Sequence, residues 1–312
     1  MTGQQGVAIR ESGRSVAHPD EVVAAHARVL AGSSAQSRYV EMASGRRIHA
    51  IEAGDGQPLV LLHGSGPTAL LFLPLLERLM GVRAIAVDRP GFGLSDPTER
   101  ASDDYRDAAV DSLTAILDGL ELAETALLGN SMGGTWALWY ALAHPDRVTR
   151  LILLGAPPLL PGTRVPPPML AVATPTVGPP PQMPPPSRET VVKSMGVFRE
   201  GDTIVRYPDQ IEAMVAAGSD QLAASAGLTE LRAAISPSGW EPALAVRPEE
   251  LQELTVPTLL IWGGQDPLGG ADVARMAAAT IPHAQLEVLS AGHAPWLGHP
   301  DRVATMVSDF LR

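Results

Sequence analysis

Short apolar runs that alternate with helical segments are the feature that most restricts the fold of this 312-residue chain. "PLVLLHG" (58–64), "VRAIAVDRPG" (82–91), "TALLGN" (125–130) and "VTRLILLGAP" (148–157) are continuous short runs, as expected for strands that are buried on both faces. Segments with helical spacing lie between them, such as "DYRDAAVDSLTAILDGL" (104–120). This alternation predicts a doubly wound α/β fold with a mostly parallel sheet.

The alternation stops after Gly155. Residues 156–186 are crowded with proline, and residues 187–253 read as mostly helical. "VPTLLIWGGQD" (256–266) and "AQLEVLSAGH" (284–293) then resume the strand pattern. The proline runs are a weaker candidate for a ligand of a proline-binding domain, because they lie inside the fold. We predict an N-terminal extension at 1–37, a core formed by 38–155 and 254–312, and an inserted, mainly helical cap at 156–253.

Composition excludes several classes of protein and site. There is no cysteine, which excludes disulfides, thiolate metal sites and cysteine nucleophiles. Acidic residues outnumber basic ones by 34 to 23, and the net charge of −11 disfavours nucleic acid and anionic membranes as partners. No apolar run reaches the roughly 20 residues of a spanning helix, and the first residues carry no secretory signal. We therefore expect a cytoplasmic protein.

Ser131 stands at the corner between the run at 125–130 and the next helical segment, with Gly129 and Gly133 two positions to either side. A sharp strand-to-helix turn strains the central residue, and glycine at these two positions avoids steric clashes. The turn would expose the hydroxyl at the carboxyl edge of the sheet, beside a helix N-terminus. This G-x-S-x-G pattern predicts a nucleophilic serine, and the alternative is a tight turn with a capping serine.

A serine nucleophile needs a base, and the base needs a carboxylate to orient it. His293 follows the last predicted strand and is the expected base, against the alternative of a packed loop histidine. Asp266 comes just past the preceding strand and is the expected carboxylate. Asp88, which ends the strand within 82–91, is the rival. The predicted chain order is serine, aspartate, histidine.

Attack on a carbonyl creates an oxyanion, which needs backbone N–H donors. Met132, at the start of the helix, offers one, and we expect the second from Ser65 in "HGSGPT". The glycines around Ser65 let that loop approach a ligand closely. The residues expected to line this end of the site are His63, Gly64, Gly66 and Asn130.

The segments "LLHGSGP", "DRPGFGLSD", "LLGNSMGG", "IWGGQDPL" and "AGHAPWLGHP" together resemble the α/β-hydrolase superfamily, over roughly 38–155 and 254–312. The resemblance implies an eight-stranded sheet, a cap inserted after the sixth strand, and neither a metal nor an organic cofactor. "HGSGP" with "GNSMGG" is similar to hydrolases that cleave carbon–carbon bonds in ring-fission dienones. Those enzymes usually carry tryptophan directly after the catalytic histidine, whereas here Ala294 follows His293.

The predicted function is hydrolysis of a small, largely apolar ester or lactone through an acyl-enzyme. One alternative is a carbon–carbon hydrolase of the ring-fission type, and another is a non-hydrolytic biosynthetic enzyme or binding protein on the same fold. The expected partner is a small-molecule substrate, and a homodimer is left open. Each residue expected to contact an apolar substrate has the alternative of a purely structural packing role; these residues are Met169, Met195, Phe198, Trp240 and Trp296.

Overall fold

The architecture is taken from a computed structural model, which describes residues 18–66, 68–97, 104–174 and 186–312. Eight strands form one sheet in the order β1-β2-β4-β3-β5-β6-β9-β10. The β1–β2 and β2–β4 pairs are antiparallel and the other pairs are parallel, which confirms the predicted mostly parallel sheet. The strands are β1 (Gln36–Glu41), β2 (Arg47–Ala53), β3 (Gln57–Leu62), β4 (Val82–Val87), β5 (Thr125–Asn130), β6 (Val148–Leu154), β9 (Thr258–Gly263) and β10 (Gln285–Leu289).

Apolar side chains project from both faces of the sheet, so a hydrophobic core forms on each face. Leu127 of β5 belongs to the core that includes α3 and α4, and Leu128 belongs to the core that includes α1, α2, α12 and α13. This alternation explains why the strands read as continuous apolar runs. The helices around the sheet are α1 (Asp20–Leu30), α2 (Leu73–Leu76), α3 (Tyr105–Gly119), α4 (Met132–Ala143), α10 (Pro248–Gln252), α11 (Ala271–Thr280), α12 (Pro295–Gly298) and α13 (Pro300–Leu311), with 3₁₀ turns η1 (Ala69–Phe72) and η2 (Pro145–Arg147).

The segment at 68–81, which reads as helical, forms only the short elements η1 and α2. Residues 69–76 are all buried, so their apolar pattern reflects burial on every side and not the single stripe of an amphipathic helix. In the described parts of the chain, no helix combines the length and the apolar character needed to cross a membrane.

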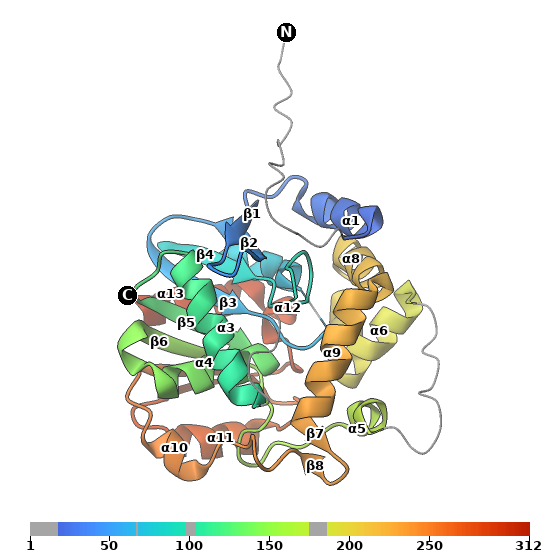
Figure 1. Cartoon of the computed structure of the whole chain (residues 1–312). Coiled ribbons are helices and arrows are strands. Elements are labelled where there is room, and N and C mark those ends of the chain that lie inside the picture. Colours follow the sequence, from blue (N-terminus) through green and yellow to red (C-terminus); the bar gives the residue numbers. More distant parts are fainter. Residues whose placement is uncertain (1–17, 67, 98–103, 175–185) are drawn as a thin grey trace.

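The segment between β6 and β9 is mainly helical, and Figure 1 shows α6, α8 and α9 side by side next to the sheet. Its elements are α5 (Pro167–Ala173), α6 (Arg188–Val197), α7 (Gly201–Ile204), α8 (Pro208–Ser219), α9 (Gln221–Ala234), β7 (Ile235–Ser236) and β8 (Gly239–Trp240). The division into extension, core and cap at the predicted boundaries stays a prediction.

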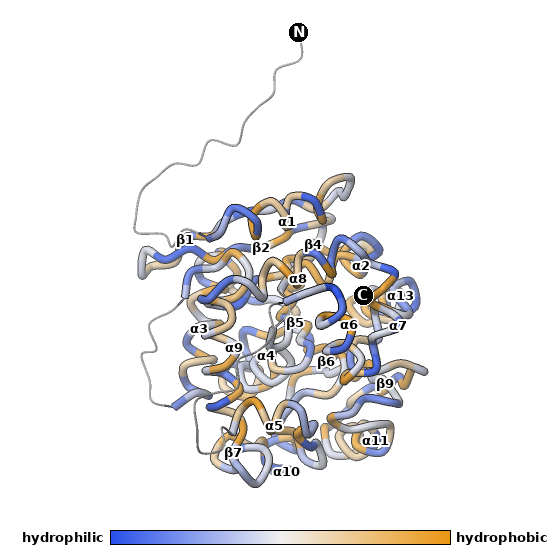
Figure 2. The backbone as a smooth tube through the Cα atoms, turned by 90° about the vertical axis from the view of Figure 1, so that its right-hand side faces the viewer, coloured by the Kyte–Doolittle hydropathy of each residue, from blue (hydrophilic) through white to orange (hydrophobic). Residues whose placement is uncertain are grey.

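Helix α1, within the predicted N-terminal extension, contacts α8. Figure 2 shows apolar and polar stretches along α1, as expected for an amphipathic helix. Val22, Ala25 and Val29 are its buried apolar residues. Residues 1–17 of the predicted extension lie outside the described residues, and β1 begins at Gln36, just before the predicted boundary. The described part of the extension therefore belongs to the folded structure.

The contact between β5 and α4 gives a paired test. A Cβ at Gly129 would lie 2.3 Å from the Gly133 carbonyl oxygen, whereas a Cβ at Gly196 in α6 would meet no atom within 4 Å. We expect Gly129→Ala to lower the free energy of unfolding by about 2–3 kcal/mol through overpacking. The control Gly196→Ala should raise it by about 0.5–1 kcal/mol, because alanine is the better helix former. Urea unfolding measures both, and equal stability of the two variants would contradict this description of the β5–α4 contact.

Candidate active site

Ser131 occupies a strained backbone position between β5 and α4, with φ 54° and ψ −128°. Positive φ is unfavourable for a residue with a side chain, so the surrounding structure has to hold it in place. A Cβ at Gly133 would lie 2.2 Å from the Leu62 carbonyl oxygen, and one at Gly129 would meet α4 as closely. The two glycines are therefore required by backbone contact, as the sequence pattern predicts.

His293 and Asp266 form a buried pair at the ends of β10 and β9. His293 Nδ1 lies 2.7 Å from Asp266 Oδ2, and the two residues are 6% and 2% exposed. The carboxylate also accepts hydrogen bonds from the backbone N–H groups of Ala156 and Leu268, each at 2.9 Å. Asp88, the rival carboxylate, pairs instead with His49 at 2.7 Å. The geometry thus supplies His293 with an oriented carboxylate, and that carboxylate is Asp266.

The other ring nitrogen of His293, Nε2, is buried and has no hydrogen-bond partner among the described residues. Ser131 Oγ is therefore not hydrogen-bonded to it in this structure. Hydrogen bonds between a nucleophile and its base are often long without substrate and tighten in the reacting complex. Nε2 remains free to accept a proton, and the assignment of Ser131, His293 and Asp266 as a catalytic triad stays a prediction.

Asn130 ties the serine corner to the loop that carries His293. Its Nδ2 donates to the backbone carbonyls of Leu154, at 2.7 Å, and His293, at 3.1 Å. A Cβ at Gly64 would lie 2.7 Å from Ser131 Cβ, so the loop after β3 also touches the serine. The structure therefore brings together the predicted residues Gly64, Asn130, Ser131 and His293, with Asn130 acting as a bridge.

His63 holds the loop after β3 in place through both of its ring nitrogens. Its Nδ1 donates to the Gly64 carbonyl at 2.7 Å, and its Nε2 accepts from the Arg89 N–H at 2.9 Å. Burial lowers the pKa of His63 to about 4, so the ring is neutral at pH 7. Since both ring nitrogens are occupied, we interpret His63 as a positioning residue for the segment that carries Ser65.

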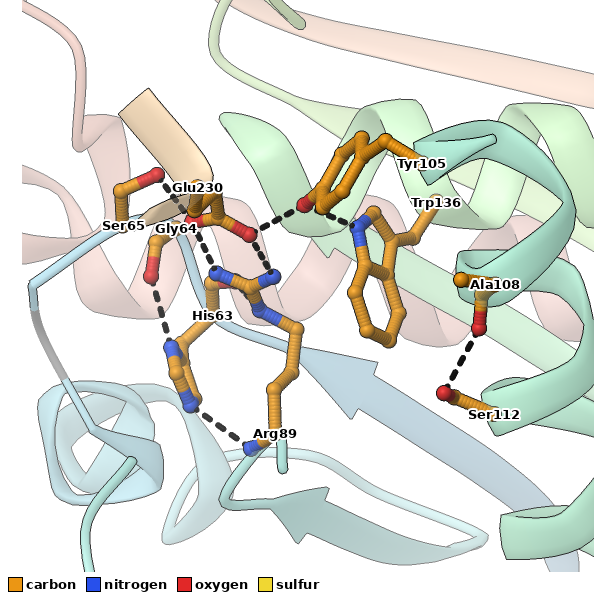
Figure 3. Close-up of polar contacts among 9 residues, drawn as sticks. All are labelled: His63, Gly64, Ser65, Arg89, Tyr105, Ala108, Ser112, Trp136 and Glu230. Atoms are coloured by element: carbon orange, nitrogen blue, oxygen red, sulfur yellow. Dashed lines mark hydrogen bonds and ion pairs between the residues drawn. The ribbon is translucent and has the colours of Figure 1, made fainter. Parts of the chain in front are cut away.

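A buried ion pair beside Ser65 links the loop to helix α9 (Figure 3). Arg89 donates two hydrogen bonds to the carboxylate of Glu230, at 2.6 and 3.0 Å. Glu230 also accepts from the hydroxyls of Ser65 and Tyr105, and Trp136 donates to the Tyr105 oxygen at 2.8 Å. Burial opposes ionisation of Glu230, but the charge of Arg89 and the hydrogen bonds from Arg89, Ser65 and Tyr105 together hold the pKa of the carboxyl below its usual value. Glu230 thus fixes the predicted cap to the predicted oxyanion loop.

A second cap segment covers the His293 loop. The Phe198 ring stacks on the His293 imidazole with 5.3 Å between centroids, and the Phe198 carbonyl accepts from the His293 N–H at 3.0 Å. Glu200 accepts from the Ala294 N–H at 3.0 Å. Its carboxyl is buried, and burial raises its pKa to about 7. A Cβ at Gly292 would lie 2.3 Å from the Phe198 carbonyl oxygen, so this close approach depends on glycine.

The other predicted substrate contacts are distributed differently. Trp296 is fully buried, lies with its ring tilted against Phe72 and donates to the Leu71 carbonyl at 2.8 Å, so we leave it out of the proposed substrate contacts. Met195 is buried in the core that contains α1 and α13. Met169 and Trp240 are half-buried and pack against the other core. Of these five residues, Phe198 is the one that stacks on His293 and accepts a hydrogen bond from it. The predicted oxyanion donors lie in the required elements: Ser65 is in the loop after β3, beside Gly66 at φ +93°, and Met132 begins α4.

A surface hollow of about 600 Å³ lies between α3 and α9. Phe92, Tyr105, Trp136, Leu222 and Glu230 are among its lining residues. Neither Ser131 nor His293 is among them, so among the described residues this hollow is not the space around the proposed nucleophile.

Residues 57–300 match the family model of the alpha/beta hydrolase fold. The chain is 33% identical over 296 residues to the 2-hydroxy-6-oxononadienedioate/2-hydroxy-6-oxononatrienedioate hydrolase of Cupriavidus pinatubonensis, covering 88% of this chain and 95% of that protein. It is 31% identical over 284 residues to the 2-hydroxymuconate semialdehyde hydrolase of Pseudomonas sp. strain CF600, covering 86% and 92%.

Solved structures give the same fold. The carboxylesterase CesB from Bacillus subtilis superposes with a TM-score of 0.73 at 22% identity, covering 93% of this chain and 96% of that chain. The meta-cleavage product hydrolase CumD from Pseudomonas fluorescens IP01 superposes with a TM-score of 0.67 at 26% identity, covering 88% and 97%. Both comparisons extend over the sheet and the helical insertion.

The raised pKa of Glu200 predicts a pH-dependent stability. Between its ordinary value of 4.5 and about 7, the unfolded chain releases the Glu200 proton and the folded chain retains it. The contribution of the protonated Glu200 carboxyl to the free energy of unfolding is therefore fully present below pH 4.5 and is lost as the pH rises to 7. The free energy of unfolding of the natural chain should fall by about 3 kcal/mol relative to Glu200→Gln over this range. The exposed Glu189→Gln control should show no such divergence in urea unfolding at stepped pH, and parallel curves for Glu200→Gln would contradict the description of its site.

The buried Arg89–Glu230 pair predicts that removing one charge destabilises the protein more than removing both charges. Glu230→Ala leaves the Arg89 guanidinium buried without a counter-charge and should lower the free energy of unfolding by about 3–5 kcal/mol. The double variant Arg89→Met, Glu230→Met removes both charges and should lose less than Glu230→Ala alone. Urea unfolding at pH 7 measures the three proteins, and an equal or larger loss in the double variant would argue against a buried, mutually dependent pair.

Proposed function

Because the chain belongs to the alpha/beta hydrolase family and is a hydrolase, we propose that it cleaves a small, uncharged ester or lactone through an acyl-enzyme on Ser131. The observation that carries this proposal is the His293–Asp266 pair at 2.7 Å, with His293 Nε2 left unpaired and Asn130 joining its loop to the strained Ser131 corner. A family member with this arrangement has the parts that acyl transfer needs.

The proposed reaction has two halves. His293 Nε2 takes the Ser131 hydroxyl proton as Oγ attacks the substrate carbonyl, and Asp266 stabilises the imidazolium that forms. The backbone N–H groups of Ser65 and Met132 are proposed to donate to the oxyanion. The imidazolium then protonates the leaving alkoxide, which departs and leaves an ester on Ser131. In the second half His293 activates a water molecule that hydrolyses this ester and restores the serine.

The proposed preference for an uncharged substrate rests on the charges near the site. A carboxylate bound in an apolar cleft needs a cation as its partner. Arg89, the buried guanidinium beside the Ser65 loop, is already paired in bidentate fashion with Glu230. Phe198, stacked over His293, adds an apolar surface. Both features favour a neutral acyl group over an anionic one.

Carbon–carbon hydrolysis of a ring-fission dienone is the second candidate. Two relatives with about 30% identity over most of this chain carry names of such hydrolases, with acidic or semialdehyde substrates. The same serine, histidine and aspartate would serve this reaction. The proposed charge balance around Arg89 is the feature that distinguishes the two candidates.

A substrate panel on three proteins tests the proposal. The natural chain, Ser131→Ala and the exposed-serine control Ser194→Ala are compared on a short p-nitrophenyl ester, a lactone and a 2-hydroxy-6-oxohexa-2,4-dienoate. We expect the ester or lactone to have the highest kcat/KM, and Ser131→Ala to lose about 10³-fold or more because the nucleophile is gone. Ser194→Ala should keep full activity.

Three results would count against the proposal in different ways. Full ester activity in Ser131→Ala would remove Ser131 as the nucleophile. A higher kcat/KM for the dienoate than for the ester would favour the carbon–carbon candidate. Failure of the folded natural chain to react with a fluorophosphonate probe would favour the non-hydrolytic alternative.

A further inference from the structure

A second cluster of chemically active side chains lies beneath helix α1. It is formed by His26 of α1, His49 of β2 and Asp88, the residue after β4. The three residues are 4%, 0% and 0% exposed, and one potential ligand atom from each lies within 4.8 Å of the others. We refer to these residues as the His26 cluster. The proposed reaction assigns no step to any of them.

Asp88 is the carboxylate of the cluster, and its Oδ2 lies 2.7 Å from His49 Nδ1. The backbone N–H groups of Ala69 and Leu94 also donate to the carboxylate, at 2.7 and 3.0 Å. The cluster therefore contains a fixed negative charge that is kept away from water.

His26 is the member that the protein structure leaves unsatisfied. Both of its ring nitrogens are buried and have no hydrogen-bond partner among the described residues. Its ring meets the His49 ring edge-on, with 5.3 Å between the centroids. A buried imidazole without any partner is unfavourable, and buried polar groups of this kind call for a physical explanation. A ligand with vacant coordination positions would satisfy one of these nitrogens.

We propose that His26, His49 and Asp88 bind a divalent transition-metal ion of the zinc type. Two neutral imidazoles and one carboxylate are a common donor set for zinc, with bonds of about 2.0–2.1 Å. Ligand atoms around such a tetrahedral ion lie roughly 3.3 Å apart, so the more distant side chains need to approach by at most about 1.5 Å. His49 Nδ1 and Asp88 Oδ2, which lie 2.7 Å apart, need to separate by about 0.6 Å to admit the ion between them. This proposal departs from the expectation, drawn from the family resemblance, that no metal is bound.

Ser37 completes the surroundings of the cluster. Its hydroxyl lies 2.6 Å from His49 Nε2, on an exposed position of β1. If His49 binds the ion through Nδ1, its ring proton moves to Nε2 and is donated to Ser37 Oγ. Such an outer hydrogen bond orients a ligating histidine and fixes its tautomer. A water molecule is the proposed fourth ligand.

The ion would join three parts of the chain. His26 brings in α1, which also contacts α8, and His18, just before α1, lies 3.3 Å from Asp220 at the start of α9. His49 and Asp88 belong to the sheet. We therefore assign the metal a structural role, in which it fastens the N-terminal helix α1 to the core next to α8 (Figure 1).

The test uses the full chain without an affinity tag, stripped of metal with a chelator and dialysed. Zinc is titrated by calorimetry, and the Tm is measured with and without the metal. We expect one saturable zinc site and a rise in Tm of about 4 °C at a free zinc concentration 100 times the Kd. Cobalt(II), used as a spectroscopic probe, should give the visible absorption of a four-coordinate ion. Absence of a one-to-one site on the natural chain would overturn the proposal.

The variant His26→Leu separates a metal ligand from a merely buried histidine. It should bind zinc at least 10-fold more weakly and lose the zinc-induced rise in Tm, while its metal-free Tm stays at or above that of the natural chain because an unpaired polar group has gone. The exposed control His283→Asn should behave like the natural chain, because asparagine tolerates the φ of 57° at this position. Equal zinc affinity in His26→Leu and the natural chain would overturn the assignment, and the cobalt spectrum of the natural chain provides a test that does not depend on how the variant folds.

Discussion

The site depends on a contact between two backbones that leaves no room for a Cβ atom. Helix α4 approaches strand β5 at Gly129 and the end of strand β3 at Gly133 so closely that a Cβ there would lie 2.3 and 2.2 Å from the carbonyl oxygens of Gly133 and Leu62. This contact forces Ser131 to a φ of 54°, and the same contact prevents it from relaxing. The position of the hydroxyl is therefore set by main-chain packing in the middle of the sheet, where the free energy of folding maintains the strain.

Two polar contacts from the inserted helices extend this rigid arrangement outward. Glu230 reaches the Ser65 loop and neutralises Arg89, and Glu200 with Phe198 covers the loop that carries His293. A buried charge is tolerated only with a partner, so the Arg89–Glu230 pair also defines where α9 must sit. The insertion thus contributes directly to the positions of the groups proposed to donate to an oxyanion and to accept a proton.

The amino-acid sequence predicted the sheet because each strand is a short apolar run with a clear end, and it predicted Ser131, His293 and Asp266 as site residues because each stands at such an end. No local sequence pattern indicated Glu230 or Glu200 as site residues. Each is an isolated glutamate in the helical insertion. Glu230 pairs with Arg89, 141 positions away, and Glu200 accepts from Ala294, 94 positions away. The sequence also did not indicate His26 as a possible metal ligand, because nothing local distinguishes it from any histidine on an amphipathic helix. The burial of Trp296 agrees with the packing alternative left open for it, since its indole donates to the Leu71 carbonyl.

Gly292 lets the loop that carries His293 pack directly against the inserted segment at Phe198. The Phe198 carbonyl occupies the space that a side chain at 292 would need, so the loop and the insertion fit each other as one surface. A chimera that carries a foreign insertion on this core would have to import residues 198–200 with their path intact, or the imidazole would lose its stacking neighbour. Specificity in this scaffold is therefore more readily redesigned at positions away from this junction than by exchanging the whole insertion.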